Sequence, residues 1–520
     1  MNTIKAAFAA FLSVGMALSL PSCHPATESN KLVILHTNDT HSQIEPDAKG
    51  FGGILRRKDL IDSVRAAEKN VLVVDAGDAV QGTLYFYLYG GKVEQEVMNI
   101  LGVNDRILGN HEFDNGLDSL AAVLKLSDAT KLSANYKMEG TALEGMFEPY
   151  TIHKYGDKKV AVIGINLDPE GMILPQNYTG LTFEPILASA NTLAEMLKKE
   201  KGVDAVVALT HIGYNPDLLV GDSILATNSR NIDIIIGGHS HDIIDPTTEQ
   251  GAARSRLRNL DGEEVLVVQT GKAGRNIGKI EINLDSLGLG ARPKYELIAV
   301  DSRFDGKVDP VLDATIKKYK HGVDSLMTLW VGATKRPLKN TDPEMLNLFS
   351  DWVLIRGKEL APDVDLSIAN KGGLRTDLPG GRFSKGQIIN ILPFRNYVTV
   401  LDVKGSDLKS IFDVMAKTDG NGVSKNVKVT YDTDGGRENY VAENILIDGK
   451  PLEPNRTYRV ATIDYLAKGG DYMSAFTNGK TVAVSPAPVF DDLLQYITTG
   501  PVAGTEIEGD TIPRWSVSKH

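Results

Sequence analysis

The feature that most constrains this chain is a series of short apolar, β-branched runs between residues 31 and 284. Continuous apolar runs of this length are typical of strands that are buried on both faces. Amphipathic stretches at residues 54–69 and 187–201 lie between runs and predict helices. This alternation predicts an α/β layered domain. The runs occupy residues 32–37, 71–77, 160–165, 205–210, 232–238 and 264–270.

The pattern changes in the second half of the chain. Residues 309–329 have helical spacing and many charges, which predicts a linking helix. Beyond residue 332 shorter strand-like runs mix with helical stretches, so we expect a second, smaller α/β domain. The expected strands are 367–369, 397–403, 427–431 and 458–462, and the expected helices are 344–358 and 407–417. The predicted organisation is a leader at 1–22, a tether at 23–30, a first domain at 31–305, a linker at 306–330 and a second domain at 331–520.

Composition excludes several classes of protein. Of 520 residues, 42% are apolar and 24% are charged, which excludes a disordered chain, a fibre and a protein with many membrane spans. The net charge of −11 argues against a nucleic-acid partner, because nonspecific binding to nucleic acid needs a basic surface. The single cysteine excludes an intramolecular disulfide framework and a thiolate-cluster metal site.

The N-terminal segment predicts export. Residues 6–20 are apolar or small throughout, and at about 1.5 Å per residue they are short for a bilayer core but suit a signal peptide. The only cysteine, Cys23, follows directly after Leu20-Pro21-Ser22. This segment resembles a bacterial lipobox, which implies a lipid on Cys23 and a lipoprotein anchored in the bacterial cell envelope, periplasmic or at the cell surface. The alternative is an ordinary signal peptide with an incidental cysteine. The lipid would be the chain's only contact with a membrane.

Potential metal ligands follow several of the predicted strands. His-x-His places two rings on one side of an extended chain, because side chains alternate with a period of two. A lone Asp-x-His is more often a turn, and a lone His-x-His is as often structural as metal-binding, whereas Gly-Asn-His-Glu is more specific. The fragments count together, because five of the ten histidines fall in them. Because open α/β sheets place their sites at the carboxyl ends of their strands, we expect the fragments to meet in one crevice. They are residues 38–41, 75–78, 109–114, 210–211 and 238–241.

In this order, Asp-x-His, Gly-Asp, Gly-Asn-His-Glu, a strand-end His and Gly-His-x-His resemble the motifs of the calcineurin-like metallophosphoesterases. The fuller spelling, His36-Thr-Asn-Asp-Thr-His41 and Gly109-Asn-His-Glu-Phe-Asp114, resembles the 5′-nucleotidase branch. The resemblance implies a four-layer β-sandwich flanked by helices, followed by a smaller nucleotide-binding α/β domain.

The resemblance also implies two divalent metal ions. Nitrogen and oxygen ligands without thiolate suit Zn, Mn, Fe or Co better than Ca or Mg. Such a metal pair would lower the pKa of a water, orient the resulting hydroxide for in-line attack and neutralise phosphoryl oxygens. By resemblance, Asp39, His41 and His241 hold one ion, Asn110, His211 and His239 hold the other, and Asp78 bridges them.

His111 follows a predicted ligand directly, so it need not face the same metal. In the family this histidine faces the phosphoryl group or the leaving oxygen, and the carboxylate three residues later, here Asp114, orients it. A carboxylate partner keeps a histidine protonated to higher pH and fixes its tautomer. The alternative is that His111 only supports its neighbours.

Three segments of the second domain resemble the 5′-nucleotidase C-terminal domain. They are Asn370-Lys-Gly-Gly-Leu-Arg375, Pro393-Phe-Arg-Asn396 and Tyr465-Leu-Ala-Lys-Gly-Gly-Asp471. The implied substrate-binding residues are Asn370, Gly373, Arg375, Phe394, Asn396, Tyr465 and Asp471.

In the family two aromatic rings clamp the nucleobase, and here these would be Phe394 and Tyr465. Arg375 would bind phosphate oxygens through its guanidinium fork, Asp471 would accept hydrogen bonds from ribose hydroxyls, and Asn396 would touch the base or sugar. The alternative for the two rings is plain core packing.

The sequence departs from the family pattern near residue 342. Leu346 stands where a glycine is common, no arginine lies beside Asp342, and Tyr465 replaces the commoner phenylalanine. The departures leave base preference open, but they do not touch the predicted metal ligands.

The prediction is therefore dimetal-dependent hydrolysis of 5′-nucleotides to nucleoside and phosphate. A related enzyme acting on UDP-sugars or 2′,3′-cyclic nucleotides is the first alternative, and a non-catalytic nucleotide-binding surface lipoprotein is the second. Oligomeric state stays open.

Overall fold

The structure is a computed structural model that describes residues 31–214, 220–286, 292–418, 421–433 and 436–518. The predicted leader, tether and lipidated Cys23 lie outside the described residues. Within the described ranges, no helix has the length and apolar character needed to cross a membrane.

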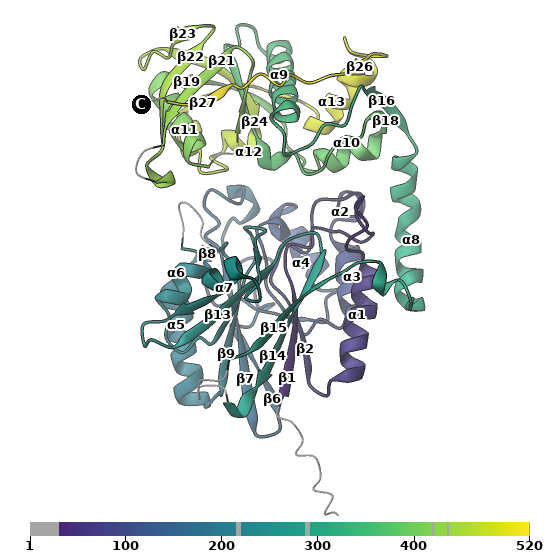
Figure 1. The fold of residues 1–520 in the computed structure, drawn as a ribbon. Helices are drawn as coiled ribbons and strands as arrows, with labels where there is room; N and C mark the ends of the chain where they lie inside the picture. Colours follow the sequence, from purple (N-terminus) through teal and green to yellow (C-terminus); the bar gives the residue numbers. More distant parts are fainter. Residues whose placement is uncertain (1–30, 215–219, 287–291, 419–420, 434–435, 519–520) are drawn as a thin grey trace, which may run out of the picture.

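Two β-sheets stack face to face in the N-terminal half (Figure 1). In spatial order, the first sheet contains β15 (Lys294–Ala299), β14 (Asn276–Asn283), β1 (Lys31–Thr37), β2 (Val71–Asp75), β3 (Asp105–Arg106) and β4 (Thr130–Lys131). The second contains β11 (Ile243–Ile244), β13 (Glu264–Thr270), β10 (Ile234–Ile236), β9 (Ala205–His211), β7 (Lys158–Asn166) and β6 (Tyr150–Tyr155), with β12 (Arg256–Arg258) paired to β13.

Helices cover the outer face of each sheet. One apolar cluster lies between the sheets and includes Ile34 of β1 and Val207 of β9. The outer face of the first sheet packs against α1 (Ile54–Ala67) and α3 (Lys92–Leu101). That of the second packs against α4 (Gly116–Leu124), α5 (Ile186–Met196) and α6 (Asp222–Thr227). Every residue of β9 is buried, which explains its unbroken apolar sequence, and the predicted four-layer arrangement is confirmed.

The predicted strands occur at the expected places, but one is shorter than expected and several further strands were not predicted. Residues 232–238 form only the short strand β10, because the chain turns at the glycines that follow it. Strands β14 and β15 were missed because polar residues alternate with apolar ones there. Strands β1 to β4 run parallel, as do β7, β9, β10 and β13. Their carboxyl ends therefore meet at one end of the sandwich, where α/β folds place their sites.

A long helix, α8 (Pro310–Met327), connects the two halves along one side of the molecule (Figure 1). Its first turn is capped by Asp309, whose carboxylate accepts hydrogen bonds from the backbone amides of Val311 and Leu312. The predicted linking helix corresponds to this element. The domain limits 31–305, 306–330 and 331–520 remain our proposal.

The C-terminal half is built from three small sheets and their covering helices. The largest sheet has the order β20 (Asn421–Val423), β17 (Leu366–Asn370), β24 (Thr457–Ile463), β19 (Val398–Lys404) and β25 (Lys480–Val484). A three-stranded sheet has the order β18 (Gly381–Ser384), β16 (Trp330–Thr334) and β26 (Glu506–Ile507). A four-stranded sheet has the order β23 (Lys450–Pro451), β22 (Val441–Ile447), β21 (Val427–Asp432) and β27 (Trp515–Val517). The main helices are α9 (Pro343–Leu360), α10 (Lys385–Ile391), α11 (Gly405–Thr418) and α13 (Val489–Thr498).

Candidate active site

The predicted metal ligands lie on turns after β1, β2, β10 and the short strand β3, except His211, which is the last residue of β9. Several of these residues have left-handed backbone conformations, which cost non-glycine residues free energy on the order of 1–3 kcal/mol each and cluster at functional sites. They are Asp39 (φ 49°), His41 (φ 47°), Asp78 (φ 52°), His239 (φ 76°) and His241 (φ 57°). Backbone hydrogen bonds hold the first two turns together, from Asp39 N to Gly77 O (2.9 Å) and from His41 N to Asp78 O (3.0 Å).

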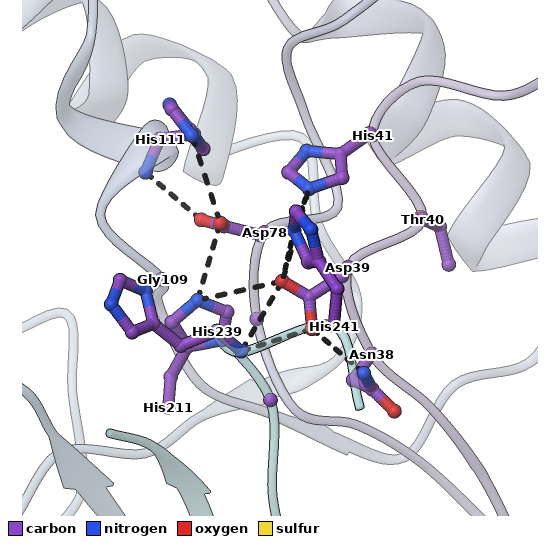
Figure 2. A network of polar contacts seen from close by, with 12 residues as sticks. Asn38, Asp39, Thr40, His41, Asp78, Gly109, His111, His211, His239 and His241 are labelled. Atoms are coloured by element: carbon purple, nitrogen blue, oxygen red, sulfur yellow. Dashed lines mark hydrogen bonds and ion pairs between the residues drawn. The ribbon is translucent and has the colours of Figure 1, made fainter. Parts of the chain in front are cut away.

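A first ligand cluster is formed by Asp39, His41 and His241, whose ligand atoms all lie within 4.8 Å of one another. His41 Nε2 is 2.9 Å from His241 Nε2, and His241 Nε2 is 3.3 Å from Asp39 Oδ1. Figure 2 shows the two rings converging on the Asp39 carboxylate. The three residues predicted for one metal are therefore together.

A second cluster is formed by Asp39, Asp78 and His211, again within 4.8 Å. His211 Nε2 lies 3.2 Å from Asp78 Oδ2, and His239 Nδ1 lies 2.9 Å from Asn110 Oδ1. All seven predicted ligands thus meet at one end of the sandwich. The Asp39 carboxylate takes part in both clusters, whereas Asp78, the predicted bridging ligand, belongs to the second cluster only.

The second cluster favours positive charge between its side chains. The Nδ1–H of His211 donates to the carbonyl of Ala76 (2.7 Å), which leaves a lone pair on Nε2 directed at the Asp78 carboxylate. Two electron-pair donors at 3.2 Å in a fully buried site repel unless positive charge lies between them. Burial lowers the pKa of His211, but Asp78 and Asp39 outweigh it and raise the pKa to about 10. Without a metal, a proton on Nε2 therefore pairs with the Asp78 carboxylate. A divalent cation would take the place of this proton, so the residues fit the predicted metals.

Two side chains missed by the sequence analysis hold the turns in place. The Glu112 carboxylate accepts hydrogen bonds from the backbone amides of Asp78 (3.0 Å), Ala79 (2.9 Å) and Gly109 (2.7 Å). Asn38 donates to Asp39 Oδ2 (2.7 Å). Asn38 and Glu112 both lie inside the recognised motifs, and this position was the only feature of the sequence that could have indicated their roles. A Cβ at Gly109 would collide with the Asp78 carboxylate, which explains the glycine.

His111 and Asp114 form the predicted pair. The 3₁₀ turn His111–Phe113 brings His111 Nδ1 to 3.1 Å from Asp114 Oδ2, while His111 Nε2 lies 4.0 Å from Asp78 Oδ2. Burial lowers the pKa of His111, but the nearby carboxylates outweigh it and raise the pKa above its ordinary value. The ring therefore carries an oriented proton beside the metal clusters.

One cavity of about 560 Å³ joins this centre to the C-terminal half. Arg375 Nη2 reaches to 3.3 Å from His41 Nε2, and the Phe394 ring lies 5.6 Å from the His111 ring. The Tyr465 hydroxyl donates to Asp471 Oδ1 (2.9 Å). Predicted residues that line the cavity are Asp78, Asn110, His111, Asp114, His239, His241, Asn370, Arg375, Phe394, Asn396, Tyr465 and Asp471.

Some predicted residues do not line this cavity, and some lining residues were not predicted. Asp39, His41 and His211 lie deeper, and Gly373 is buried near Asn370. Most of the unpredicted wall comes from α2 (Leu84–Tyr89) and from residues within 172–177 of the N-terminal half. Gly90, Asn115, Gly372, Pro393 and Arg395 complete it. Neither segment carries a polar motif that sequence patterns could have singled out.

The layered fold and the paired clusters define a metal-dependent phosphoesterase. Residues 32–242 match the family model of calcineurin-like phosphoesterases, and residues 322–478 match that of the 5′-nucleotidase C-terminal domain. The chain belongs to the 5′-nucleotidase family of metallophosphoesterases. It is a metal-dependent phosphoric ester hydrolase of a family that uses two divalent cations.

Known relatives match nearly the whole chain. A snake venom 5′-nucleotidase from Naja atra is 29% identical over 490 residues, covering 85% of this chain and 91% of the relative. The Homo sapiens 5′-nucleotidase is 28% identical over 494 residues, covering 86% and 84%. The crystal structure of a 5′-nucleotidase precursor from Thermus thermophilus superposes with a TM-score of 0.83 at 27% identity and covers 94% of this chain and all of that one.

Proposed function

We propose that this protein hydrolyses 5′-nucleotides to nucleoside and phosphate. The observation that carries the proposal is the shared cavity, which has the metal ligands at one end and Phe394, Tyr465 and Asp471 at the other. A phosphoryl group at the first end and a base at the second match the two ends of a nucleotide. The relatives named 5′-nucleotidases support this substrate class and do not favour the sugar-nucleotide, cyclic-nucleotide or non-catalytic alternatives.

At the metal end, Asp39, His41 and His241 would hold one cation, and Asn110, His211 and His239 the other, with Asp78 between them. When bound, two such cations lower the pKa of water and neutralise phosphoryl oxygens. Arg375 adds a guanidinium beside His41, where it can bind a phosphoryl oxygen through charge-assisted hydrogen bonds.

His111 would serve the phosphoryl group or the leaving oxygen. Its Nδ1 faces Asp114, so its Nε2 is the free end of the ring toward the cavity. A proton held there can stabilise the departing 5′-oxygen, and Asp114 keeps the ring in the required tautomer.

At the other end, Phe394 and Tyr465 would stack against the base. Asp471 would accept hydrogen bonds from ribose hydroxyls, and Asn370 and Asn396 line the cavity close by. Each stacked ring contributes about 1–3 kcal/mol in single-strand binders, and the stacking tolerates different bases. We therefore expect broad activity on nucleoside monophosphates.

The deciding experiment is a phosphate-release panel. The chelated protein is supplied with Zn²⁺, Mn²⁺, Fe²⁺ or Co²⁺ in turn and is offered AMP, other 5′-nucleotides, UDP-glucose and 2′,3′-cyclic AMP. We expect metal-dependent release of adenosine and phosphate from AMP. Faster cleavage of UDP-glucose or of the cyclic nucleotide would replace the proposed substrate, and no turnover with any metal would refute the activity.

The proposed site of action is outside the cytoplasm, with a lipid on Cys23. The apolar residues 6–20 and the adjoining cysteine support this proposal. Export suits the reaction, because a charged nucleotide crosses membranes poorly whereas its nucleoside is neutral. Metabolic labelling with palmitate should mark the protein and should fail in Cys23→Ala, and equal labelling of both would contradict the anchor.

A further inference from the structure

A buried polar network lies behind the turn that carries His239 and His241, and it is separate from the ligands themselves. Its centre is Gln269 near the end of β13, which is fully buried. The Gln269 Nε2 donates to Asp222 Oδ2 (3.1 Å) and to the carbonyl of Gly238 (3.2 Å), and its Oε1 accepts from the Ser240 hydroxyl (3.1 Å). The Gln269 side chain therefore hydrogen-bonds the His-x-His turn at two points, Gly238 and Ser240. It also hydrogen-bonds the Asp222 carboxylate.

Asp222, the first residue of α6, connects these hydrogen bonds to the neighbouring strand β9. Its Oδ1 accepts a hydrogen bond of 2.6 Å from the hydroxyl of Thr210, the residue directly before His211. A Cβ at Gly237 would collide with Asp222 Oδ2, so the end of β10 packs directly against the carboxylate. The end of β9 and the end of β10 are thus tied to the same buried side chain.

The turn needs such support because its backbone is strained and because it supplies a ligand to each of the two clusters. His239 and His241 both have left-handed backbone conformations. The His241 ring meets Asp39 and His41, whereas the His239 ring meets Asn110 in the other cluster. The other hydrogen bonds that hold this turn include those from Gly213 N to Gly238 O (3.1 Å), from His239 N to the Asp39 carboxylate, and from Tyr214 N to Ser240 Oγ (3.2 Å). A small shift of the turn would move ligands of both clusters together.

We propose that Gln269 and Asp222 are positioning residues that fix His211, His239 and His241 relative to one another, so that disturbing Gln269 weakens both metal positions at once. This inference rests on the metal assignment of the proposed function. A purely structural role, in which the network only satisfies buried polar groups, would lower stability without a matching loss of metal affinity.

The test reverses the polarity of one hydrogen bond. Gln269→Glu places a carboxylate against Asp222 and against the Gly238 carbonyl, both of which are acceptors. Asp222→Asn supplies an amide donor in its place, so the double variant restores the bond between the two side chains. Asn347→Ala is the matched control, because Asn347 is a buried amide that donates to two backbone carbonyls, those of Asp510 and Ile512, in the C-terminal half.

Each chelated protein is titrated with Mn²⁺ alone, with bound ions counted per chain and the unfolding midpoint recorded without metal. We expect Gln269→Glu to weaken both Mn²⁺ positions by about 10–100-fold, the usual effect of losing a supporting hydrogen bond behind metal ligands. The double variant should recover most of this affinity. Asn347→Ala should lower the midpoint and bind two ions as the parent does, whereas His241→Ala should weaken one position much more than the other.

Unchanged affinity in Gln269→Glu, loss confined to one position, or no recovery in the double variant would each overturn the proposal. AMP hydrolysis is measured separately. A parent protein that binds two Mn²⁺ ions and leaves every nucleotide intact would refute the proposed function while the titrations still decide the positioning role.

Discussion

The two ends of the cavity are built on different principles. At the metal end, Asp39, Asp78 and His211 are almost fully buried, and backbone and side-chain hydrogen bonds fix their turns. At the nucleoside end, Phe394 and Tyr465 are only half-buried. One end is rigid and charged, whereas the other is more open and offers aromatic faces and single polar groups.

This difference separates chemistry from recognition. The metal end belongs entirely to the N-terminal half, so changes there should affect every phosphate ester alike. The nucleoside end belongs to the C-terminal half. It contacts the metal end through Arg375, which lies beside His41, and through Phe394, which lies beside His111. Changes there should depend on whether the substrate has a base.

Asp78→Asn should have the largest effect and tests the metal end directly. The amide loses the negative charge that we propose to lie between the two cations. We therefore expect kcat/KM to fall at least about 1,000-fold for every substrate, since a metal pair supplies several kcal/mol of charge stabilisation. AMP and p-nitrophenyl phosphate are compared at saturating Mn²⁺. Asp402→Asn, a carboxylate paired with Arg459 far along the chain, is the control. A loss limited to AMP would break the division between the two ends.

His111→Ala should lower kcat about 100–10,000-fold with both substrates, the usual range for a general acid or base. Asp114→Asn should lower it less, because it acts through the histidine. The double variant should match His111→Ala alone, since residues that act as a unit are not additive. Bound Mn²⁺ should remain at two ions per chain, and loss of an ion would mean that His111 supports the metals instead.

Phe394→Ala should discriminate between substrates. Losing one stacking face should raise KM for AMP about 5–150-fold, the equivalent of 1–3 kcal/mol. Ribose 5-phosphate, which has no base, should be cleaved with little change by the parent and the variant. Phe394→Tyr keeps the ring and is the matched control. Equal effects on both substrates would show that the ring is only packing against His111.

The layered fold and the metal end were accessible from the sequence because their signals are local. Each ligand ends a strand or lies in the turn beyond one, and parallel strands bring their carboxyl ends together whatever the loops between them. The runs that became β1, β2, β7, β9 and β13 are apolar for the same reason, since layers cover both of their faces. The same short segments of sequence therefore predicted both the strands and the metal ligands.

Interactions between distant segments were not accessible in this way. No sequence pattern around Glu112 predicts that its carboxylate accepts hydrogen bonds from three backbone amides. Gln269 lies 47 residues from Asp222 in the chain, so their hydrogen bond could not be predicted from local sequence. The proximity of Arg375 to His41 depends on how two halves of the chain pack, across a separation of 334 residues. The cavity wall of α2 is an aromatic and leucine stretch that reads as ordinary core. Only packing gives these residues a role.

Buried charge in the metal half should also have a cost, which Glu94 on α3 allows us to measure. Glu94 is 2% exposed, and both of its carboxylate oxygens are buried. Burial raises the pKa of Glu94 to about 7. In the unfolded chain the carboxyl titrates near 4.5, so between these values the folded state binds more protons and the free energy of unfolding falls as pH rises. Above pH 7 this contribution is constant.

Glu94→Gln removes this titration. The chelated variant should equal the parent near pH 4.5 and exceed it in free energy of unfolding at pH 8, by up to about 3 kcal/mol if the full shift is realised. Glu96→Gln is the control on the same helix, because Glu96 is half-buried and accepts a hydrogen bond from Tyr319. Urea unfolding at both pH values measures the difference. Parallel curves for Glu94→Gln and the parent would mean that water reaches the Glu94 carboxylate and that hydration stabilises this charge. A gain at pH 8 with unchanged Mn²⁺ affinity would show that this charge is distinct from those that hold the metals.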